Sequence, residues 1–497
     1  MRQTFWTVLI AGAALVVLSA QAPAELQIVN DAAQALGGKD RVQAVKTIAI
    51  EGEGSSWGAV GGPSPLGAQN LTKVTEYRQL IDVARERMRV TSTRTLQFPF
   101  ALATVTRPDQ RLDGDIAFNV GGGRGGANAA TRANAAAWRQ RRLDFLSHPI
   151  TIVRAALHPG AKLTNLRMQA GQQLVDVTTV LGEKMTLAVD NLTKLPSSVS
   201  WATSDDNLGD ITIQMSFAQY EDAAGLKLPK KISTKTDKWN TGELLVSKNT
   251  VDGDVGDLAA PDAVKSSPLP PPPPGVVVTA EPVGKGIWYM GGTGEHSVLF
   301  EFADHLLLFE TPISDARTLA VIAKARETVP GKPLTMAVTS HHHFDPAGGF
   351  RAAVSEGLTM LMYKDNVALF KDVATRPHTI NPDALAKSPR VFKFQAVDDK
   401  LTLKDATMEV VLYHVKGDVH ADTELIAWVP RDRILVEADQ YDRAWLQHPW
   451  GENFLKNVEQ RKLNVERILA IHGTGPEPWN EVVQTIKSKG SAPAATN

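Results

Sequence analysis

The chain has 497 residues, of which 43% are hydrophobic and 22% charged, as in globular proteins large enough for two or three domains. Its 53 basic and 54 acidic side chains leave a formal charge of −1, so the composition does not indicate nucleic acid or an anionic membrane surface as a partner. Cysteine is absent, which excludes disulfides, thiolate metal ligands and cysteine nucleophiles.

Residues 1–24 are typical of a secretory signal peptide. Arg2 is followed by the apolar run FWTVLIAGAALVVLSA and then by small residues that end in Ala22-Pro23-Ala24, the order expected of a signal peptide and its cleavage site. A transmembrane anchor needs about 20 apolar residues, and this run is shorter. We therefore expect cleavage after Ala24, no stable membrane insertion, and a mature protein that is periplasmic or secreted.

Residues 25–260 predict a domain rich in β-strands. Apolar and polar residues alternate in RMRVTSTRTL and in DITIQMSF, a period of two that is typical of half-buried strands. One helical pattern interrupts the strands at about residues 141–157. The strand-like segments include TIAIEG, ARERMRVTSTRTL, QQLVDVTTVL, MTLAVD, DITIQMSF and ELLVSKNTV. Together they predict an antiparallel sheet curled over little helix.

This first half also resembles the bacterial lipoprotein-carrier (LolA-like) family. The likeness lies in ALGGKDRVQAVKTIAIEGEG near its start and in VDNLTKLPSSV and YEDAAGLKLPKKI further on. The resemblance implies a LolA-like half-barrel with an apolar concave face.

A glycine-rich run, residues 121–126, satisfies the dinucleotide-binding pattern GxGxxG. It follows the possible strand DIAFNV, and Asp144 lies near the offset of a ribose-binding acid. However, its neighbours are rich in alanine and asparagine, and no βαβ alternation follows. The run is therefore interpreted as a flexible loop.

Residues 261–281 are interpreted as a linker between domains. The stretch PDAVKSSPLPPPPPGVVV contains five consecutive prolines, Pro270 to Pro274, which favour a stiff polyproline II conformation without a packed core.

In residues 282–490 the order of predicted elements differs, because strands and helices alternate. HSVLFEF, HLLLFETP and LTMAVTS are strand-like, whereas ISDARTLAVIAKARETV and GGFRAAVSEG are helical patterns. Such alternation predicts a layered α/β domain, so the whole chain is expected to belong to the α+β class.

The strand LTMAVTS runs into the sequence HHHFDPAGG. If the chain stays extended beyond the strand, then His341, His343 and Asp345 project to one side, and His342 and Phe344 point the other way. Imidazole and carboxylate groups suit zinc. The alternative, three histidines of a polar loop that face solvent, stays open on this segment alone.

Three further candidate ligands lie at the ends of predicted strands. His420 precedes the apolar strand of HADTELIAWVP, Asp439 follows RILVEA, and His472 follows RILAI. A single histidine or aspartate at such a place is more often structural. Their occurrence in order along one domain favours a shared metal site.

These motifs, VTSHHHFDPAGG, HADTELIAWVP, ILVEAD and ILAIHG, resemble the successive metal motifs of the metallo-β-lactamase superfamily, over about residues 282–487. The resemblance implies an αβ/βα sandwich with a two-zinc site at its edge. By position, it implies one zinc ion held by His341, His343 and His420, and a second held by Asp345, Asp439 and His472.

Pro346 stands where most members of that superfamily carry a histidine ligand of the second metal. Proline has neither an imidazole nor a backbone N–H, so it cannot be a ligand. The second site is therefore weakened, although three protein ligands and a shared water can still complete a tetrahedron. Proline also restrains the preceding residue to extended angles, which is expected to hold Asp345 in its ligand-presenting direction.

The sequence thus predicts an exported zinc-dependent hydrolase that acts on a small-molecule substrate. A metal-bound hydroxide would cleave an amide, ester, lactone or related bond, and the catalytic Asp345 would orient that hydroxide or take its proton. The alternative is a non-catalytic periplasmic carrier of an apolar ligand with a single structural zinc. The missing histidine at Pro346 keeps this alternative open.

Overall fold

The computed structural model describes residues 23–67, 69–97, 104–121, 129–445, 448–473 and 475–489. The predicted signal peptide, apart from its last two residues, lies outside these ranges, as does most of the glycine-rich run. Within the described residues, no helix combines the length and the apolar character needed to cross a membrane.

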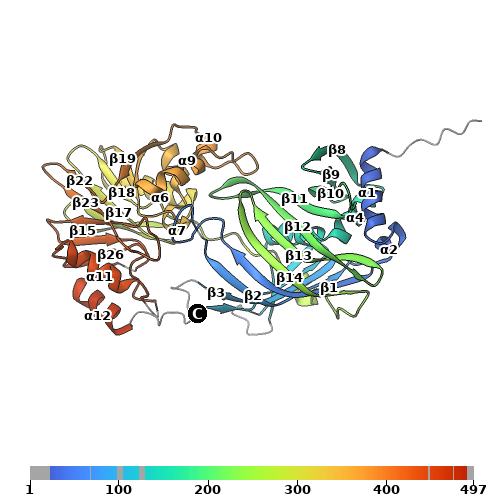
Figure 1. The fold of residues 1–497 in the computed structure, drawn as a ribbon. Coiled ribbons are helices and arrows are strands. Elements are labelled where there is room, and N and C mark those ends of the chain that lie inside the picture. Colours follow the sequence, from blue (N-terminus) through green and yellow to red (C-terminus); the bar gives the residue numbers. More distant parts are fainter. Residues whose placement is uncertain are drawn as a thin grey trace, which may run out of the picture.

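The first half of the chain forms one large antiparallel sheet (Figure 1). Its 14 strands are ordered β7-β6-β5-β3-β2-β1-β14-β13-β12-β11-β10-β9-β8, and β4 pairs with β3. The strands are β1 Thr47–Trp57, β2 Leu71–Asp82, β3 Arg87–Leu96, β4 Val105–Thr106, β5 Asp109–Asp113, β6 Ile116–Val120, β7 Ala130–Arg132, β8 Lys162–Gln169, β9 Gln172–Thr178, β10 Lys184–Asp190, β11 Pro196–Asp205, β12 Gly209–Ala223, β13 Leu226–Thr236 and β14 Trp239–Val251. The antiparallel sheet predicted for this half is therefore present.

The apolar face of this sheet packs against four helices, α1 Ala24–Ala35, α2 Lys39–Ala44, α3 Ala135–Leu146 and α4 Pro149–Leu157. The core between them contains Val29 and Leu36 of the first helical segment, Ile152 of α4, and Ile48 and Leu187 of the strands. Burial of these apolar side chains is the main term that holds the sheet on the helices. The likeness to lipoprotein carriers remains an expectation from sequence.

The helices of this half differ from the sequence prediction in two ways. Helices α1 and α2 were not predicted, and the helix expected over residues 141–157 is two helices. The chain breaks at His148, whose Nδ1 accepts a hydrogen bond from the backbone N–H of Ile150 at 3.2 Å. Pro149 then occupies the first position of α4, where its missing N–H has no helical partner to lose.

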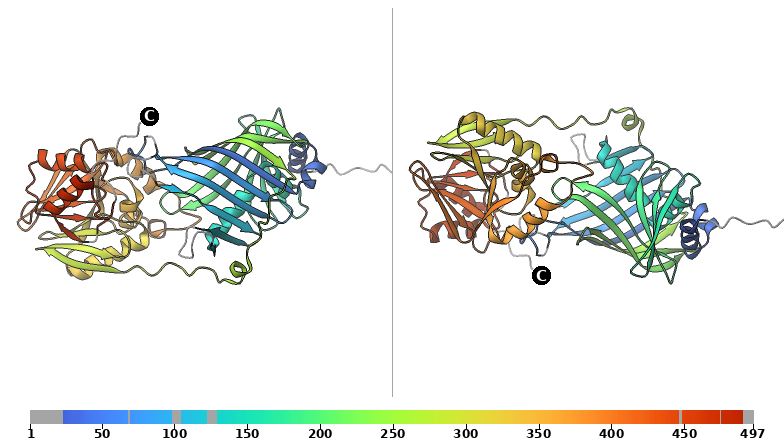
Figure 2. Two further views of the ribbon diagram at one scale, coloured as in Figure 1. Left: turned by 90° about the horizontal axis from the view of Figure 1, so that it is seen from below. Right: turned by 90° about the horizontal axis from the view of Figure 1, so that it is seen from above.

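The proline-rich segment runs along the outside of the molecule between the two halves (Figure 2). It begins with helix α5 Asp262–Ser266, and residues 271–277 are exposed and without regular structure. It ends earlier than the predicted boundary at residue 281, because β15 Val278–Gly284 already pairs with β16.

The second half contains two sheets. The first has the order β15-β16-β17-β18-β19-β20-β21, antiparallel as far as β18 and parallel beyond it; the second has the order β22-β23-β24-β25-β26-β27. Their remaining strands are β16 Ile287–Gly292, β17 Ser297–Glu301, β18 Leu306–Phe309, β19 Leu334–Thr339, β20 Thr359–Tyr363, β21 Lys393–Val397, β22 Lys400–Lys404, β23 Glu409–His414, β24 Leu425–Val429, β25 Ile434–Glu437, β26 Arg467–Ala470 and β27 Pro476–Pro478.

These sheets form the middle of a four-layer sandwich, helix–sheet–sheet–helix. One apolar core lies between the two sheets. A second lies between the first sheet and its helices, and a third between the second sheet and α11 and α12. The helices are α6 Asp315–Thr328, α7 Phe344–Ala347, α8 Phe350–Ser355, the 3-10 turn Lys364–Asn366, α9 Val367–Thr375, α10 Ala384–Lys387, α11 Gly451–Gln460 and α12 Trp479–Lys489. The layered α/β architecture predicted for this half is confirmed.

The two halves also touch directly, away from the linker. Leu208 and Ile211 of the first half belong to the apolar core beneath the helices of the second. The carboxylate of Asp210 accepts hydrogen bonds from the backbone N–H of Thr379 at 2.9 and 3.0 Å, and the Asp210 N–H donates to the carbonyl of Pro377 at 2.7 Å. The halves are therefore packed and hydrogen-bonded to each other.

Candidate metal centre

The three consecutive histidines follow strand β19, and the chain then turns instead of staying extended. His343 is the N-terminal cap residue of α7, and Asp345 lies in the first turn of that helix. The predicted extended path, with three ligands projecting to one side, is therefore wrong for Asp345. The extended backbone angles that Pro346 was predicted to impose on Asp345 are also wrong, because Asp345 is a residue of α7.

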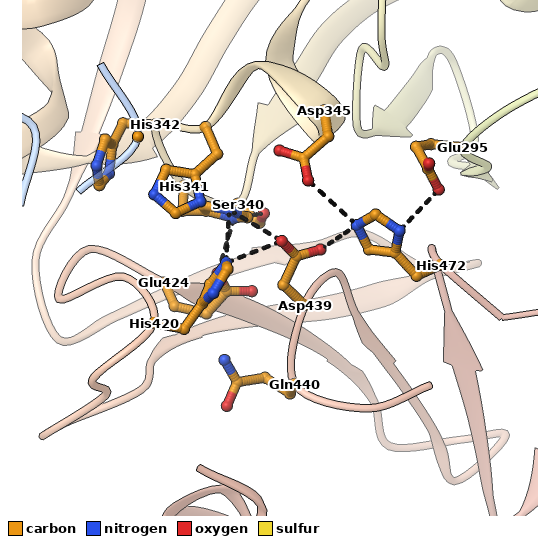
Figure 3. Close-up of polar contacts among 12 residues, drawn as sticks. Glu295, Ser340, His341, His342, Asp345, His420, Glu424, Asp439, Gln440 and His472 are labelled. Atoms are coloured by element: carbon orange, nitrogen blue, oxygen red, sulfur yellow. Dashed lines mark hydrogen bonds and ion pairs between the residues drawn. The ribbon is translucent and has the colours of Figure 1, made fainter. Parts of the chain in front are cut away.

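Four side chains form a buried cluster, His341, His343, His420 and Asp439. Each offers one ligand atom, and these atoms lie within 4.8 Å of one another. His341 Nε2 and His420 Nε2 are 3.3 Å apart, and Asp439 Oδ2 lies 2.8 Å from His420 Nε2 and 3.4 Å from His341 Nε2 (Figure 3). The ligand atoms expected to hold the first metal are thus brought together.

The separation of the two imidazole nitrogens matches that expected in a tetrahedral zinc site. With Zn–N bonds of about 2.0–2.1 Å, two nitrogen ligands of a tetrahedron are separated by about 3.3 Å. This is the separation of His341 Nε2 and His420 Nε2. The donor set, imidazole nitrogen and carboxylate oxygen without thiolate, also suits zinc.

A second cluster contains Asp345, Asp439 and His472. His472 Nε2 pairs with Asp439 Oδ1 and lies 3.5 Å from Asp345 Oδ2. Asp439 therefore turns one oxygen to each cluster (Figure 3). The side chain of Asp345 is 46% exposed and that of His472 is 17% exposed, whereas that of Asp439 is 3% exposed. Solvent consequently reaches the centre from the side of Asp345.

Two carboxylates that the sequence interpretation did not single out orient the histidines. Glu424 Oε2 lies 2.8 Å from His341 Nδ1, and Glu295 Oε2 lies 2.9 Å from His472 Nδ1. A carboxylate at Nδ1 holds the proton there and leaves Nε2 as the lone-pair donor, an arrangement common behind metal-binding histidines. A signal for Glu424 was available, since it directly precedes the fully apolar strand β24, where an acidic residue is unusual.

Further buried groups fix the loops that carry His420 and Asp439. Asp418 accepts hydrogen bonds from the His420 N–H at 3.0 Å and from Gln440 Nε2 at 2.6 Å. Glu437 accepts from the Gln440 N–H at 2.6 Å, so the turn that presents Asp439 is closed by a carboxylate at the end of β25. These groups hold the two loops to each other.

The charges of the site shift the pKa values of its members in opposite directions. Burial lowers the pKa of His341, but the carboxylates of Glu424 and Asp439 outweigh burial and raise it well above its usual value. Burial raises the pKa of Asp439, but His472 and the other imidazoles lower it well below its usual range. The carboxylates thus favour a positive charge at this place, which a divalent cation supplies when it displaces the protons.

His342 has a different role from its neighbours. Its Nε2 donates to the carbonyl of Gly62 at 2.8 Å, and its Nδ1 lies 3.1 Å from the Thr423 hydroxyl. Both ring nitrogens are therefore engaged. His342 lies beside a loop of the first half (Figure 3), and its ring centroid is 4.6 Å from that of His343, so it is a neighbour of the first cluster.

Comparisons with known proteins gave only structural matches. No protein-family model and no curated protein matches the chain. Similar solved structures include a metallo-β-lactamase from Pontibacter korlensis, with 13% identity, coverage of 43% of this chain and 99% of that chain, and a TM-score of 0.35. A metallo-β-lactamase from Hirschia baltica has 16% identity, coverage of 43% of this chain and 97% of that chain, and a TM-score of 0.33.

A third similar structure is the metallo-β-lactamase FIM-1 from Pseudomonas aeruginosa in a mono-zinc form. It has 18% identity, coverage of 44% of this chain and 99% of that chain, and a TM-score of 0.35. Since these identities and TM-scores are low, we base the function on the side chains of the site.

Proposed function

We propose that this protein is a metal-dependent hydrolase with its centre at the edge of the sandwich. The observation that carries the proposal is the convergence of three imidazoles on Asp439, whose second oxygen faces His472 and Asp345. Such a set of donors, buried and oriented by further carboxylates, is unusual for a structural network and suits a divalent cation.

In this proposal His341, His343 and His420 hold a first zinc ion, and Asp345, Asp439 and His472 hold a second. Zinc bound there would act as a Lewis acid and make water nucleophilic at neutral pH. The buried first cluster excludes bulk solvent, and the half-exposed Asp345 stands where water and substrate enter. Its carboxylate would orient the attacking water or accept its proton.

The reaction proposed is the addition of water across an amide, ester, lactone or related bond of a small molecule. Asp345 and His472 line the open side of the centre, so the scissile bond would approach from there. We further propose that the protein acts after export, on the basis of the signal-peptide pattern of residues 1–24.

A chromogenic panel of esters, lactones and a cephalosporin, measured with and without a chelator, tests the reaction class. We expect turnover of at least one class, loss of that turnover on chelation, and recovery when zinc is returned. The variants His341→Ala and His420→Ala should remove the same activity. Turnover that survives both substitutions would contradict the proposal.

A carrier function is the second candidate, supported by a cavity of about 200 Å³ in the first half. Apolar side chains, among them Phe145, Leu146 and Val180, form half of its lining, and polar or charged ones, among them Arg142 and Arg154, form the other half. A carrier would bind one zinc ion and hydrolyse none of the panel, so the same measurements separate the two functions.

A further inference from the structure

The loop between β1 and β2 in the first half reaches across to the metal centre of the second half. In Figure 1 these strands end beside α7. The buried carbonyl of Gly62 accepts hydrogen bonds from two histidines, from His342 Nε2 at 2.8 Å and from His343 Nε2 at 2.9 Å. The carbonyl of Pro63 accepts from the Asp422 N–H at 2.8 Å.

We propose that this loop, residues 58–67, is a working part of the metal centre, in which the Gly62 carbonyl positions His343 for metal binding. A carbonyl can only accept, so Nε2 of His343 must carry the ring proton. A ring that binds a metal is neutral and carries a single proton. The lone pair is therefore on Nδ1, the remaining atom able to bind a metal.

The position of this acceptor in the chain distinguishes His343 from the other ligands. The acceptors behind His341 and His472 are Glu424 and Glu295, both of the second half. The acceptor behind His343 lies 281 positions earlier in the chain. The first half thereby completes a site whose ligands all belong to the second half.

His342 and Gln69 hold the Gly62 carbonyl in place. His342 is fully buried and bridges Gly62 to Thr423, and the Gly62 N–H donates to Gln69 Oε1 at 3.1 Å. His342 acts through Gly62 and is a positioning residue.

A linkage between the loop and the metal follows. A cation on Nδ1 withdraws electron density from the ring and strengthens the hydrogen bond that Nε2–H donates to Gly62. Metal binding and docking of the loop therefore stabilise each other by the same free energy. This inference rests on the metal centre of the proposed function and is independent of hydrolysis.

The test measures zinc affinity of the full chain by competition with a chromogenic chelator, in parallel with hydrogen exchange of residues 58–67. In the wild type, zinc should slow exchange of the loop. His342→Ala should lower zinc affinity by about 10-fold, the size of effect seen for groups behind metal ligands. Gln69→Ala should act in the same direction, more weakly. Gln140→Ala, at an exposed glutamine of α3, is the matched control and should change neither quantity.

The outcomes separate this inference from the proposed function. If His342→Ala and Gln69→Ala both bind zinc with unchanged affinity, the linkage is overturned and the proposed hydrolase is not. The same holds if zinc does not change the hydrogen exchange of the loop in the wild type. A wild-type chain that binds no zinc overturns both. Because Gln69 is only partly buried at the edge of the loop, its variant keeps the test decisive if His342→Ala fails to fold.

Discussion

Asp439 is shared by both clusters, and Asp345 belongs to the exposed one alone. Asp439 Oδ2 faces His420 and His341, whereas Oδ1 faces His472. Removing the charge at each position should therefore have different consequences, because one carboxylate serves two groups of ligands and the other serves one.

Asp345→Asn should lower turnover by about 100-fold, since the group proposed to orient water or take its proton loses its basicity. The first zinc ion should be retained. Asp439→Asn should lower turnover as well, and its zinc content should fall below that of Asp345→Asn, because Oδ2 of Asp439 also contacts His420 and His341 of the first cluster. Equal zinc content and equal turnover in the two variants would contradict these roles. Steady-state kinetics and elemental analysis of the same preparations provide the measurement.

His148 gives the first half a dependence on pH that is independent of the metal. Burial lowers its folded-state pKa to about 3 from the usual 6.5. Between these values the unfolded chain binds more protons than the folded one, so stability falls as pH falls, by up to about 1.4 kcal/mol per pH unit from this residue.

The variant His148→Asn keeps an acceptor for the N-terminus of α4 and removes the titration. Urea unfolding at several pH values from 6.5 down to about 3 should therefore give a shallower loss of stability in His148→Asn than in the wild type. Parallel curves would mean that the imidazole titrates alike in the folded and unfolded states.

The turn between β11 and β12 depends on a glycine where the two halves meet. Gly209 has a φ of +70°, and a Cβ atom there would lie 2.3 Å from the carbonyl oxygen of Pro377 and 2.5 Å from the His378 ring. Moving the Pro377 backbone or the buried His378 ring away would cost free energy, so only glycine permits this close approach.

Gly209→Ala should consequently destabilise the contact between the halves by about 2–4 kcal/mol, from backbone strain and the clash together. Gly225→Ala is the matched control, because Gly225 has a φ of +78° but no atom within 4 Å of its added Cβ. Denaturant unfolding of both variants isolates the clash. An equal loss of stability would show that the close approach is not maintained in solution.

Sequence periodicity predicted the strands with clear alternation, but it did not single out β2, β11 or β13, and it predicted the turns poorly. The strands β3, β12 and β19 could be predicted from local sequence. A strand buried on one face shows alternating apolar residues, as in β3 and β12, and a strand buried on both faces shows an apolar run, as in β19. Helix α1 was missed because its buried face, Ile28, Val29, Ala32 and Ala33, is half alanine and gives a weak pattern. The two helices of residues 135–157 are separated by the cap residue His148. A periodicity averaged over a turn or more does not detect a break of this length.

The candidate site was predictable where it depends on strand ends. His420, Asp439 and His472 lie close together because the strands that they adjoin end at one edge of the sandwich. The helical turn that carries Asp345 could not be predicted, since it depends on contacts such as the hydrogen bond from Ile313 N–H to the Asp345 carbonyl. Gly62 carries no local signal, because its role comes from packing between halves.

The whole molecule combines a sheet domain and a layered domain that share an apolar core and a set of hydrogen bonds at their contact. The loop of residues 58–67 joins the first half to the ligands of the second. A metal bound to the folded chain and not to the unfolded one stabilises the fold by mass action, about 2.7 kcal/mol at 100 times the dissociation constant. That stabilisation should reach both halves through their contact.

Zinc content per chain, measured on the wild type and on His341→Ala and His420→Ala after dialysis against the same zinc concentration, tests the metal centre most directly. We expect one to two zinc ions per wild-type chain and loss of the first ion in both variants, because each removes a nitrogen of the buried cluster. A wild-type chain without stoichiometric zinc, or variants that retain the full wild-type content, would contradict the metal centre and the hydrolase built on it.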